Sequence, residues 1–358
     1  MSEATKADSK TGAGRFFEDF RLGDEMVHAT PRTVTTGDAA LYLALTGSRF
    51  ALQSSDDFAA ACGFTRAPLD DLLTFHLVFG KTVPDISLNA IANLGYADGR
   101  FGVPAYPGDT LTAVSRVIGL RENANRKSGI VYVRTVGSNQ RGEVVVDYAR
   151  WVMVRKRDAS SPAPAPAIPD LADHVLAERL MAPSTLDFAH YDLTLAGSPH
   201  VWESYSEGER IDHIDGVTVE EAEHMMATRL YQNTARVHFN RHAQAAERVG
   251  RRLVYGGHVM SLARALSFNG LGNGAKIAAI NGGRHVNPTF AGDTLYAWSE
   301  ILARWEIPGR GDIGALRVRT LAAKDRPCAD FPDKGAGGEF DPSIVLDFDY
   351  TVLIPRRG

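Results

Sequence analysis

The segment Asn233-Thr-Ala-Arg-Val-His238 carries residue types that proton transfer requires. The imidazole of His238 titrates near neutral pH, so it can both accept and return a proton. The amide of Asn233 can orient a water molecule through one acceptor and two donors, but it cannot accept a proton as a carboxylate would. The chain has 11 histidines, and most histidines are structural, so assigning His238 as the catalytic base depends on the segments around it.

A pair of glycines, Gly256-Gly257, lies at the predicted start of a helix. The apolar residues that follow have the i, i+3, i+4, i+7 spacing of one helix face: Val259, Leu262, Ala263 and Leu266. The first N–H groups of a helix have no intrahelical acceptor, and glycine permits close approach by a substrate. We therefore expect the N–H groups of Gly256 and Gly257 to bind an oxygen that becomes negatively charged, with Tyr255 beside them.

These segments belong to the second of two similar halves of the chain. Three features recur at an offset of 184 or 185 residues, which makes an internal duplication the best interpretation. They are Phe17-Glu18 with Trp202-Glu203, 32–53 with 216–238, and Gly-Asp-Thr-Leu at 108–111 and 292–295. In this alignment Gln53 takes the place of His238.

Each half has the same predicted order of elements. A short helix comes first, at 36–45 and at 219–230, the second with Thr218 as its N-cap. A more apolar helix follows, and after it the hydrophobic period changes to two, at 143–154, 316–321 and 344–354. Helix first and strands afterwards predict an α+β fold in which a long helix is wrapped by a curved antiparallel sheet, used twice.

The domain boundaries follow from composition. Residues 159–169 (ASSPAPAPAIP) form a Pro/Ala linker, because proline removes the donors that helices and sheets need. We therefore predict a disordered tail at 1–14, an N-terminal domain at 15–158, and a C-terminal domain at 170–358. The Pro/Gly/Asp-rich stretch 324–342 is predicted to be a long loop between strands of the second domain.

Composition excludes several classes of protein. The 358 residues carry a net charge of −4 without long charged runs, which argues against a nucleic-acid partner or a polybasic membrane patch. No apolar run approaches the length of a membrane span, and two cysteines cannot organise a disulfide framework. A cytoplasmic enzyme is the expectation.

These residues resemble the MaoC-like, double-hotdog acyl-CoA hydratases of the (R)-specific hydratase 2 group. The family signature is Asp-x-Asn-Pro-x-His, followed by a glycine-containing segment at the start of the central helix. The second half matches it in His238 and the glycines but has Asn233 in the place of Asp. The first half, at 48–53 and 68–72, has lost both features. The decapeptide 231–240 looks most like that of the mesaconyl-CoA (2-methylfumaryl-CoA) hydratases.

The resemblance implies two tandem hotdog folds and the reversible addition of water to mesaconyl-CoA, giving β-methylmalyl-CoA. Within it, His238 and Asn233 would be the catalytic residues, His238 moving the proton and Asn233 holding the water. A carboxylate from elsewhere is an alternative to Asn233: Glu203, Asp212 or Asp215. The family also implies no cofactor and no metal, since coenzyme A is part of the substrate, and it implies a homodimer.

A dicarboxylic substrate needs a cation for its free carboxylate, and arginine suits that geometry. Arg236 and Arg284 are the expected substrate-binding arginines, with Arg251 as a further candidate. Other interpretations remain open: another (R)-specific enoyl-CoA hydratase, a hotdog thioesterase, or an acyl-CoA binding protein without activity. A thioesterase would need an acidic residue on the helix, and only the first half offers Asp70 and Asp71, which are expected to serve the helix N-terminus.

Overall fold

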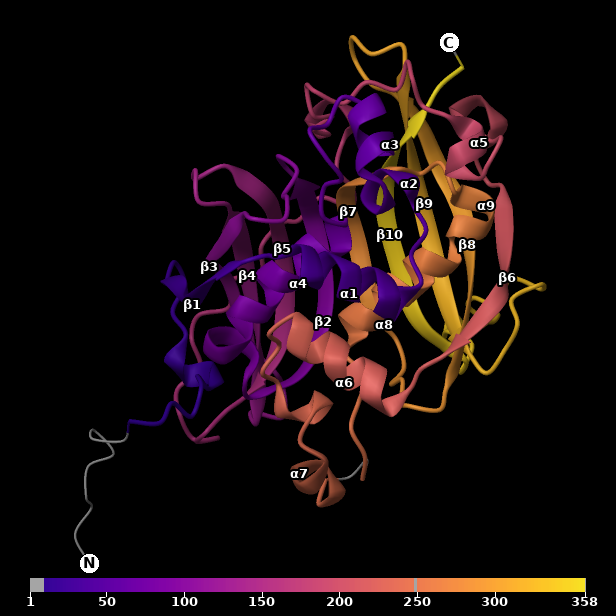
Figure 1. Cartoon of the computed structure of the whole chain (residues 1–358). Coiled ribbons are helices and arrows are strands. Elements are labelled where there is room, and N and C mark those ends of the chain that lie inside the picture. The colour runs from indigo at the N-terminus through magenta and orange to yellow at the C-terminus, as the bar shows by residue number, and fades with distance from the viewer. Residues whose placement is uncertain (1–9, 248–249, 358) are drawn as a thin grey trace, which may run out of the picture.

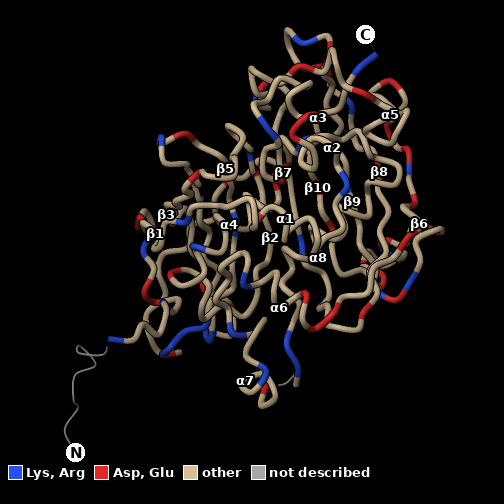
Figure 2. The backbone as a smooth tube through the Cα atoms, viewed as in Figure 1, with Lys and Arg blue, Asp and Glu red and all other residues tan. Residues whose placement is uncertain are grey.

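The computed structural model describes residues 10–247 and 250–357, and most of the tail expected at 1–14 therefore lies outside the described residues. The two halves of the chain lie side by side, each with its helices over one face of a shared sheet (Figure 1). No helix within the described ranges has both the length and the apolarity needed to cross a membrane. Figure 2 shows basic and acidic residues interspersed along the chain, mostly in outer loops and strand ends.

The described chain forms one antiparallel sheet of ten strands, five from each half. Its order from one edge to the other is β1 (Glu25–Thr33), β3 (Thr110–Glu122), β4 (Ser128–Ser138), β5 (Val144–Arg155), β2 (Ala90–Phe101), β7 (Lys276–His285), β10 (Ile344–Pro355), β9 (Ile313–Lys324), β8 (Thr294–Glu306) and β6 (Arg210–Thr218). The two halves meet at β2 and β7, where Tyr96 lies opposite Gly283. This arrangement confirms the predicted α+β class and the predicted repeat.

A long buried helix packs against the sheet in each half. These helices are α4 (Asp71–Thr82), which contacts β3, β1 and β5, and α8 (Gly256–Leu266), which contacts β8, β9 and β10. Every residue of α4 is buried, because the sheet covers one side and other helices cover the other. The remaining helices are α1 (Thr36–Thr46), α2 (Ala51–Ser54), α3 (Asp56–Ala61), α5 (Leu193–Ala196), α6 (Glu221–Leu230), α7 (Arg241–Ala245) and α9 (Phe268–Leu271).

The predicted caps had different outcomes. Asp70 is the N-cap of α4, as expected, and its carboxylate accepts a hydrogen bond from Leu72 N at 2.8 Å. The prediction that Thr218 caps the helix at 219–230 is wrong, since α6 begins at Glu221. The hydroxyl of Thr218 instead forms a hydrogen bond with that of Thr294, 2.8 Å away on the neighbouring strand β8. Strand pairing therefore outweighed the local capping preference.

The segments predicted between elements have defined places. In the Pro/Ala segment, Ala167 and Leu120 exchange two backbone hydrogen bonds of 2.8 Å, so the segment runs beside β3. The long loop predicted at 324–342 matches the gap between β9 and β10. Both Gly-Asp-Thr turns lead directly into strands, β3 at Thr110 and β8 at Thr294.

A buried polar chain is repeated in both halves. In the first half, His28 Nε2 lies 2.8 Å from Ser115 Oγ, which lies 2.7 Å from Thr135 Oγ1. In the second, the corresponding residues are His213, Ser299 and Thr320, with both contacts at 2.7 Å. Side-chain hydrogen bonds at matching positions support the duplication independently of backbone topology.

Because His213 and His258 are buried, we expect acid to destabilise the fold. Burial lowers the pKa of His213 to about 4 and that of His258 to about 3, below the ordinary value of 6.5. The unfolded chain therefore binds more protons below pH 6.5, and stability falls as the pH drops from 6.5 toward 4, by about 1.4 kcal/mol per pH unit and histidine. We expect Tm to decrease steadily over this range in thermal denaturation. His213→Asn should flatten the decrease, and an unchanged slope would contradict the assignment.

Candidate active site

The segment that carries His238 is shaped by Asn233. This buried side chain accepts a hydrogen bond from Ala235 N through Oδ1 at 2.9 Å, which closes a tight turn after α6. A short 3-10 helix, Arg236–His238, follows directly. One acceptor lone pair of the amide is thus used within the turn. Asn233 positions the turn, and its NH2 group is the part that remains to contact a water molecule.

His238 is held in one tautomer. Its Nδ1 lies 3.0 Å from the carbonyl oxygen of Leu253, and because a carbonyl only accepts, Nδ1 carries the proton. Nε2 therefore has the lone pair that a general base uses. Burial lowers the pKa of His238 to about 4, with a smaller effect from His224, so the imidazole is neutral at pH 7. Its ring also packs against the ring of Tyr255, with centroids 5.5 Å apart.

The two glycines begin α8 between packed rings. Tyr255 occupies the N-cap position, so Gly256 and Gly257 supply the first two N–H groups of the helix, which have no intrahelical acceptor. A Cβ on Gly256 would lie 2.4 Å from the His285 ring. A Cβ on Gly257 would lie 2.4 Å from the Tyr255 ring and 2.7 Å from His76 Cε1. Both positions therefore require glycine, and both N–H groups remain as donors at the positive end of the helix.

Sequence reasoning missed His285, which lies against this helix start. It is the last residue of β7, and its Nε2 is 3.2 Å from the hydroxyl of Tyr96 on β2 of the other half. The Tyr96 hydroxyl can donate to Nε2 or accept from it, and the tautomer of His285 decides which of the two occurs. Burial, together with nearby His238, lowers the pKa of His285 to about 4.

The arginines that were expected to bind the substrate carboxylate lie on the protein surface. Arg236 and Arg284 are exposed, and Arg284 points away from His285 because neighbouring strand residues face opposite sides of a sheet. Arg251 is also exposed and stacks on Phe290 at 3.7 Å. These positions do not suit a clamp for a buried acyl group.

Two of the three alternative carboxylates, Glu203 and Asp212, are engaged in other contacts. Glu203 pairs with Arg356 at 3.3 Å, and the Asp212 carboxylate accepts a hydrogen bond from Ile214 N at 3.0 Å. Asp215 is exposed on β6, at the edge of the sheet. Asp212 and Asp215 lie on β6 and Glu203 lies shortly before it, whereas the candidate site is at the start of α8.

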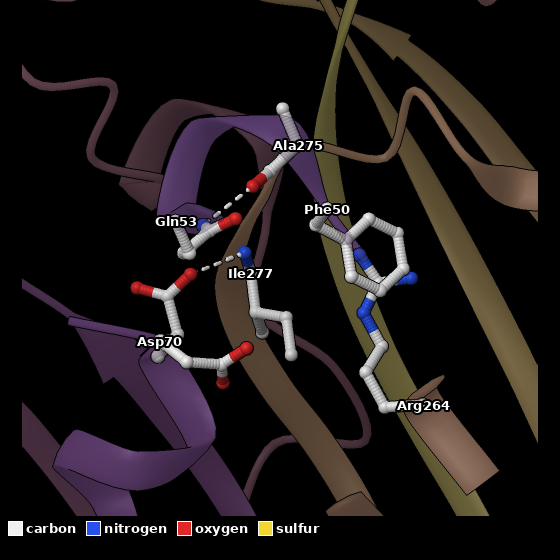
Figure 3. Close-up of a pocket in the computed structure, with 7 residues that line it drawn as sticks. Phe50, Gln53, Asp70, Arg264, Ala275 and Ile277 are labelled. Atoms are coloured by element: carbon white, nitrogen blue, oxygen red, sulfur yellow. Dashed lines mark hydrogen bonds between the residues drawn. The ribbon is translucent and has the colours of Figure 1, made fainter. Parts of the chain in front are cut away.

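The corresponding place in the first half is filled. Gln53 donates to the carbonyl oxygen of Ala275 at 2.8 Å (Figure 3). Asp71 accepts from Ile277 N at 2.8 Å. Asp71 also forms a buried ion pair with Lys276. The cavity between these groups and Arg264 encloses about 10 Å³, room for a single water molecule. The acidic residues that a thioesterase would need are therefore committed to structure.

This fold and site define a double-hotdog protein of the MaoC-like dehydratase class. The crystal structure of a MaoC domain protein dehydratase from Chloroflexus aurantiacus matches with a TM-score of 0.96 and 67% identity, covering 98% of this chain and 100% of that one. A Mycobacterium tuberculosis protein with a double hotdog fold matches with a TM-score of 0.76 and 26% identity, covering 96% and 99%.

Sequence comparison assigns the chain to one family among the proteins that share this fold. The model of the mesaconyl-CoA hydratase family matches residues 2–329, and the chain belongs to this family. It is 67% identical to the beta-methylmalyl-CoA dehydratase of Chloroflexus aurantiacus over 350 residues, covering 98% of this chain and 99% of the relative. It is 60% identical to the mesaconyl-CoA hydratase of Cereibacter sphaeroides over 348 residues, covering 97% and 100%. The family resemblance seen in the sequence is confirmed.

Proposed function

We propose that this chain catalyses the reversible hydration of mesaconyl-CoA to β-methylmalyl-CoA. One observation carries the proposal: among the described residues, the neutral imidazole of His238 bonds through Nδ1 alone, and its ring packs on Tyr255, the residue directly before the first two N–H groups of α8. Family membership supports the substrate, since the two relatives are named for the two directions of one reaction. The arrangement supplies a base and an oxyanion site, which are the two devices that water addition to an enoyl thioester needs.

In the proposed mechanism His238 carries out both proton transfers. Nε2 of His238 takes one proton from water, and the water oxygen bonds to the carbon β to the thioester. The π electrons move toward the thioester oxygen, where the N–H groups of Gly256 and Gly257 stabilise the charge. The protonated His238 then returns its proton to the α carbon, and the imidazole is neutral again.

The pKa of His238 predicts a one-sided pH dependence. The base acts only when neutral, and its pKa of about 4 keeps it neutral from pH 6 to 8. We therefore expect kcat/KM to be flat across this range and to fall as the pH approaches 4, because protonation removes the Nε2 lone pair. Initial rates after brief exposure to each pH separate this effect from acid unfolding. A profile that declines through pH 6.5 would contradict the assignment.

A spectrophotometric assay tests the proposed function directly. Loss of enoyl-thioester absorbance without release of free thiol indicates hydration, whereas thiol release indicates a thioesterase. Failure to hydrate any short enoyl-CoA would overturn the proposal. We further propose that the enzyme needs no cofactor or metal, because the side chains and N–H groups named above supply each proton and charge contact. The homodimer and the cytoplasmic location expected from the sequence stay part of this proposal.

A further inference from the structure

Arg150 is a fully buried cation that pairs with no carboxylate of residues 10–247 or 250–357. It lies on β5 of the first half, with an exposed fraction of 0%. Its guanidinium donates to Thr82 Oγ1 at 2.7 Å and to Asn93 Oδ1 at 3.4 Å, both neutral groups. Lys276 shows the contrast, since that buried cation is paired with Asp71. An uncompensated buried charge is costly to a fold and therefore points to an anionic ligand.

Other donors without partners gather around Arg150. Within the described residues, four buried side-chain atoms of this region have no hydrogen-bond partner: Arg150 Nε, Asn93 Nδ2, Tyr148 Oη and Tyr255 Oη. Tyr148 and Tyr255 both lie close enough to the guanidinium to affect its pKa, as does Tyr96. All four atoms can donate a hydrogen bond. A carboxylate has about four acceptor positions and suits such a set.

A chain of ring contacts connects this donor cluster to the candidate catalytic base. The Arg150 guanidinium carbon is 4.3 Å from the centre of the Phe79 ring, which is 5.6 Å from the Tyr255 ring. The Tyr255 ring is in turn 5.5 Å from that of His238. Tyr255 is thus shared between the base and the cation. In mesaconyl-CoA the free carboxylate is bonded to the carbon that water attacks, so the group that binds it must belong to the same site as the base, and Tyr255 contacts both.

We propose that Arg150, with the hydroxyls of Tyr148 and Tyr255, binds the free carboxylate of a dicarboxylic acyl-CoA. This inference rests on the proposed hydratase function and names the residue that selects its substrate class. It replaces Arg236 and Arg284, which are exposed. The first half thereby supplies the specificity group and the second half supplies the base.

The test compares two substrates that differ only at the carboxylate. Mesaconyl-CoA is set against 2-methylcrotonyl-CoA, in which a methyl group replaces that carboxylate. Arg150→Met should lower kcat/KM for mesaconyl-CoA by 100-fold or more and leave the value for 2-methylcrotonyl-CoA unchanged or higher. Arg116→Met is the matched control, because Arg116 is exposed on β3 of the same half. An equal loss with both substrates, or no loss with mesaconyl-CoA, would overturn the proposal.

Further measurements keep the inference decidable if Arg150→Met does not fold. Arg150→Lys and Tyr148→Phe preserve bulk, and each should lower kcat/KM selectively for mesaconyl-CoA; an unselective loss counts against the clamp. Binding of both acyl-CoA compounds by isothermal titration gives an answer that is independent of turnover. If the unmodified protein hydrates neither compound, the proposed function fails, and selective loss of mesaconyl-CoA binding in the variants then decides the role of Arg150. If it uses both compounds equally well, the clamp fails and the hydratase function stands.

Discussion

Replacing His238 with alanine is expected to lower kcat for mesaconyl-CoA hydration by about 10²–10⁴-fold. The reason is that the substitution removes the Nε2 lone pair, and the neighbouring Asn233 amide cannot accept a proton in its place. The His238–Leu253 hydrogen bond is also lost, but this region is only half-buried, so the fold should persist. Steady-state rates with thermal denaturation of the same samples measure both effects.

His190→Ala is the matched control for this variant. His190 is exposed, so its removal should leave kcat and Tm unchanged. His238→Asn retains a polar side chain of similar reach but not the base, and it should be as inactive as His238→Ala. Turnover by either His238 variant within tenfold of the unmodified protein would show that another group transfers the proton.

Gly257→Ala is expected to reduce kcat by about 10²–10³-fold, the usual cost of losing one oxyanion donor. The added Cβ would lie 2.4 Å from the Tyr255 ring and 2.7 Å from His76 Cε1, so the first turn of α8 or these rings must shift. A shift of that size misaligns the N–H groups against the thioester oxygen, because hydrogen bonds weaken steeply as their geometry departs from linear. Steady-state kinetics with mesaconyl-CoA checks the effect, which should fall mainly on kcat.

A glycine in open space provides the comparison. A Cβ on Gly311 meets no atom within 4 Å, so Gly311→Ala should leave kcat unchanged. The Gly257 result has two parts that can be separated: a loss in Tm reports crowding, and a loss in kcat at unchanged substrate affinity reports the oxyanion site. Full activity in Gly257→Ala would mean that the N–H groups of α8 do not stabilise the enolate.

Much of the second-half site was predictable because it is local in sequence. His238, Gly256 and Gly257 lie within one short stretch of sequence. A histidine indicates proton transfer, and glycines at a helix start indicate free N–H donors. The repeat at an offset of 184 or 185 residues could also be read from the sequence, and it predicted one fold used twice; the resemblance to a known family implied that this fold is the hotdog. Strand alternation explains why Arg284 is exposed while its neighbour His285 lies against the start of α8.

The contribution of the first half could not be predicted in the same way. Tyr96 and Arg150 come from β2 and β5, and only the pairing of β2 with β7 brings them to a site that starts at residue 233. Such pairing depends on the packing of whole sheets rather than on local pattern. One signal was nevertheless present: Arg150 occupies the inward face of β5 between Tyr148 and Val152, where a strand of a soluble core normally has an apolar residue.

The filled counterpart site around Gln53 and Asp71 bears on how such an enzyme changes over generations. Because Gln53 takes the place of the histidine there, that half is free of the demands that His238 places on the second. Substitutions there can retune which acyl group is accepted while the chemistry stays intact. A fused pair of unequal copies thus separates two selective pressures that a symmetric pair, whose every mutation appears twice, would have to satisfy together.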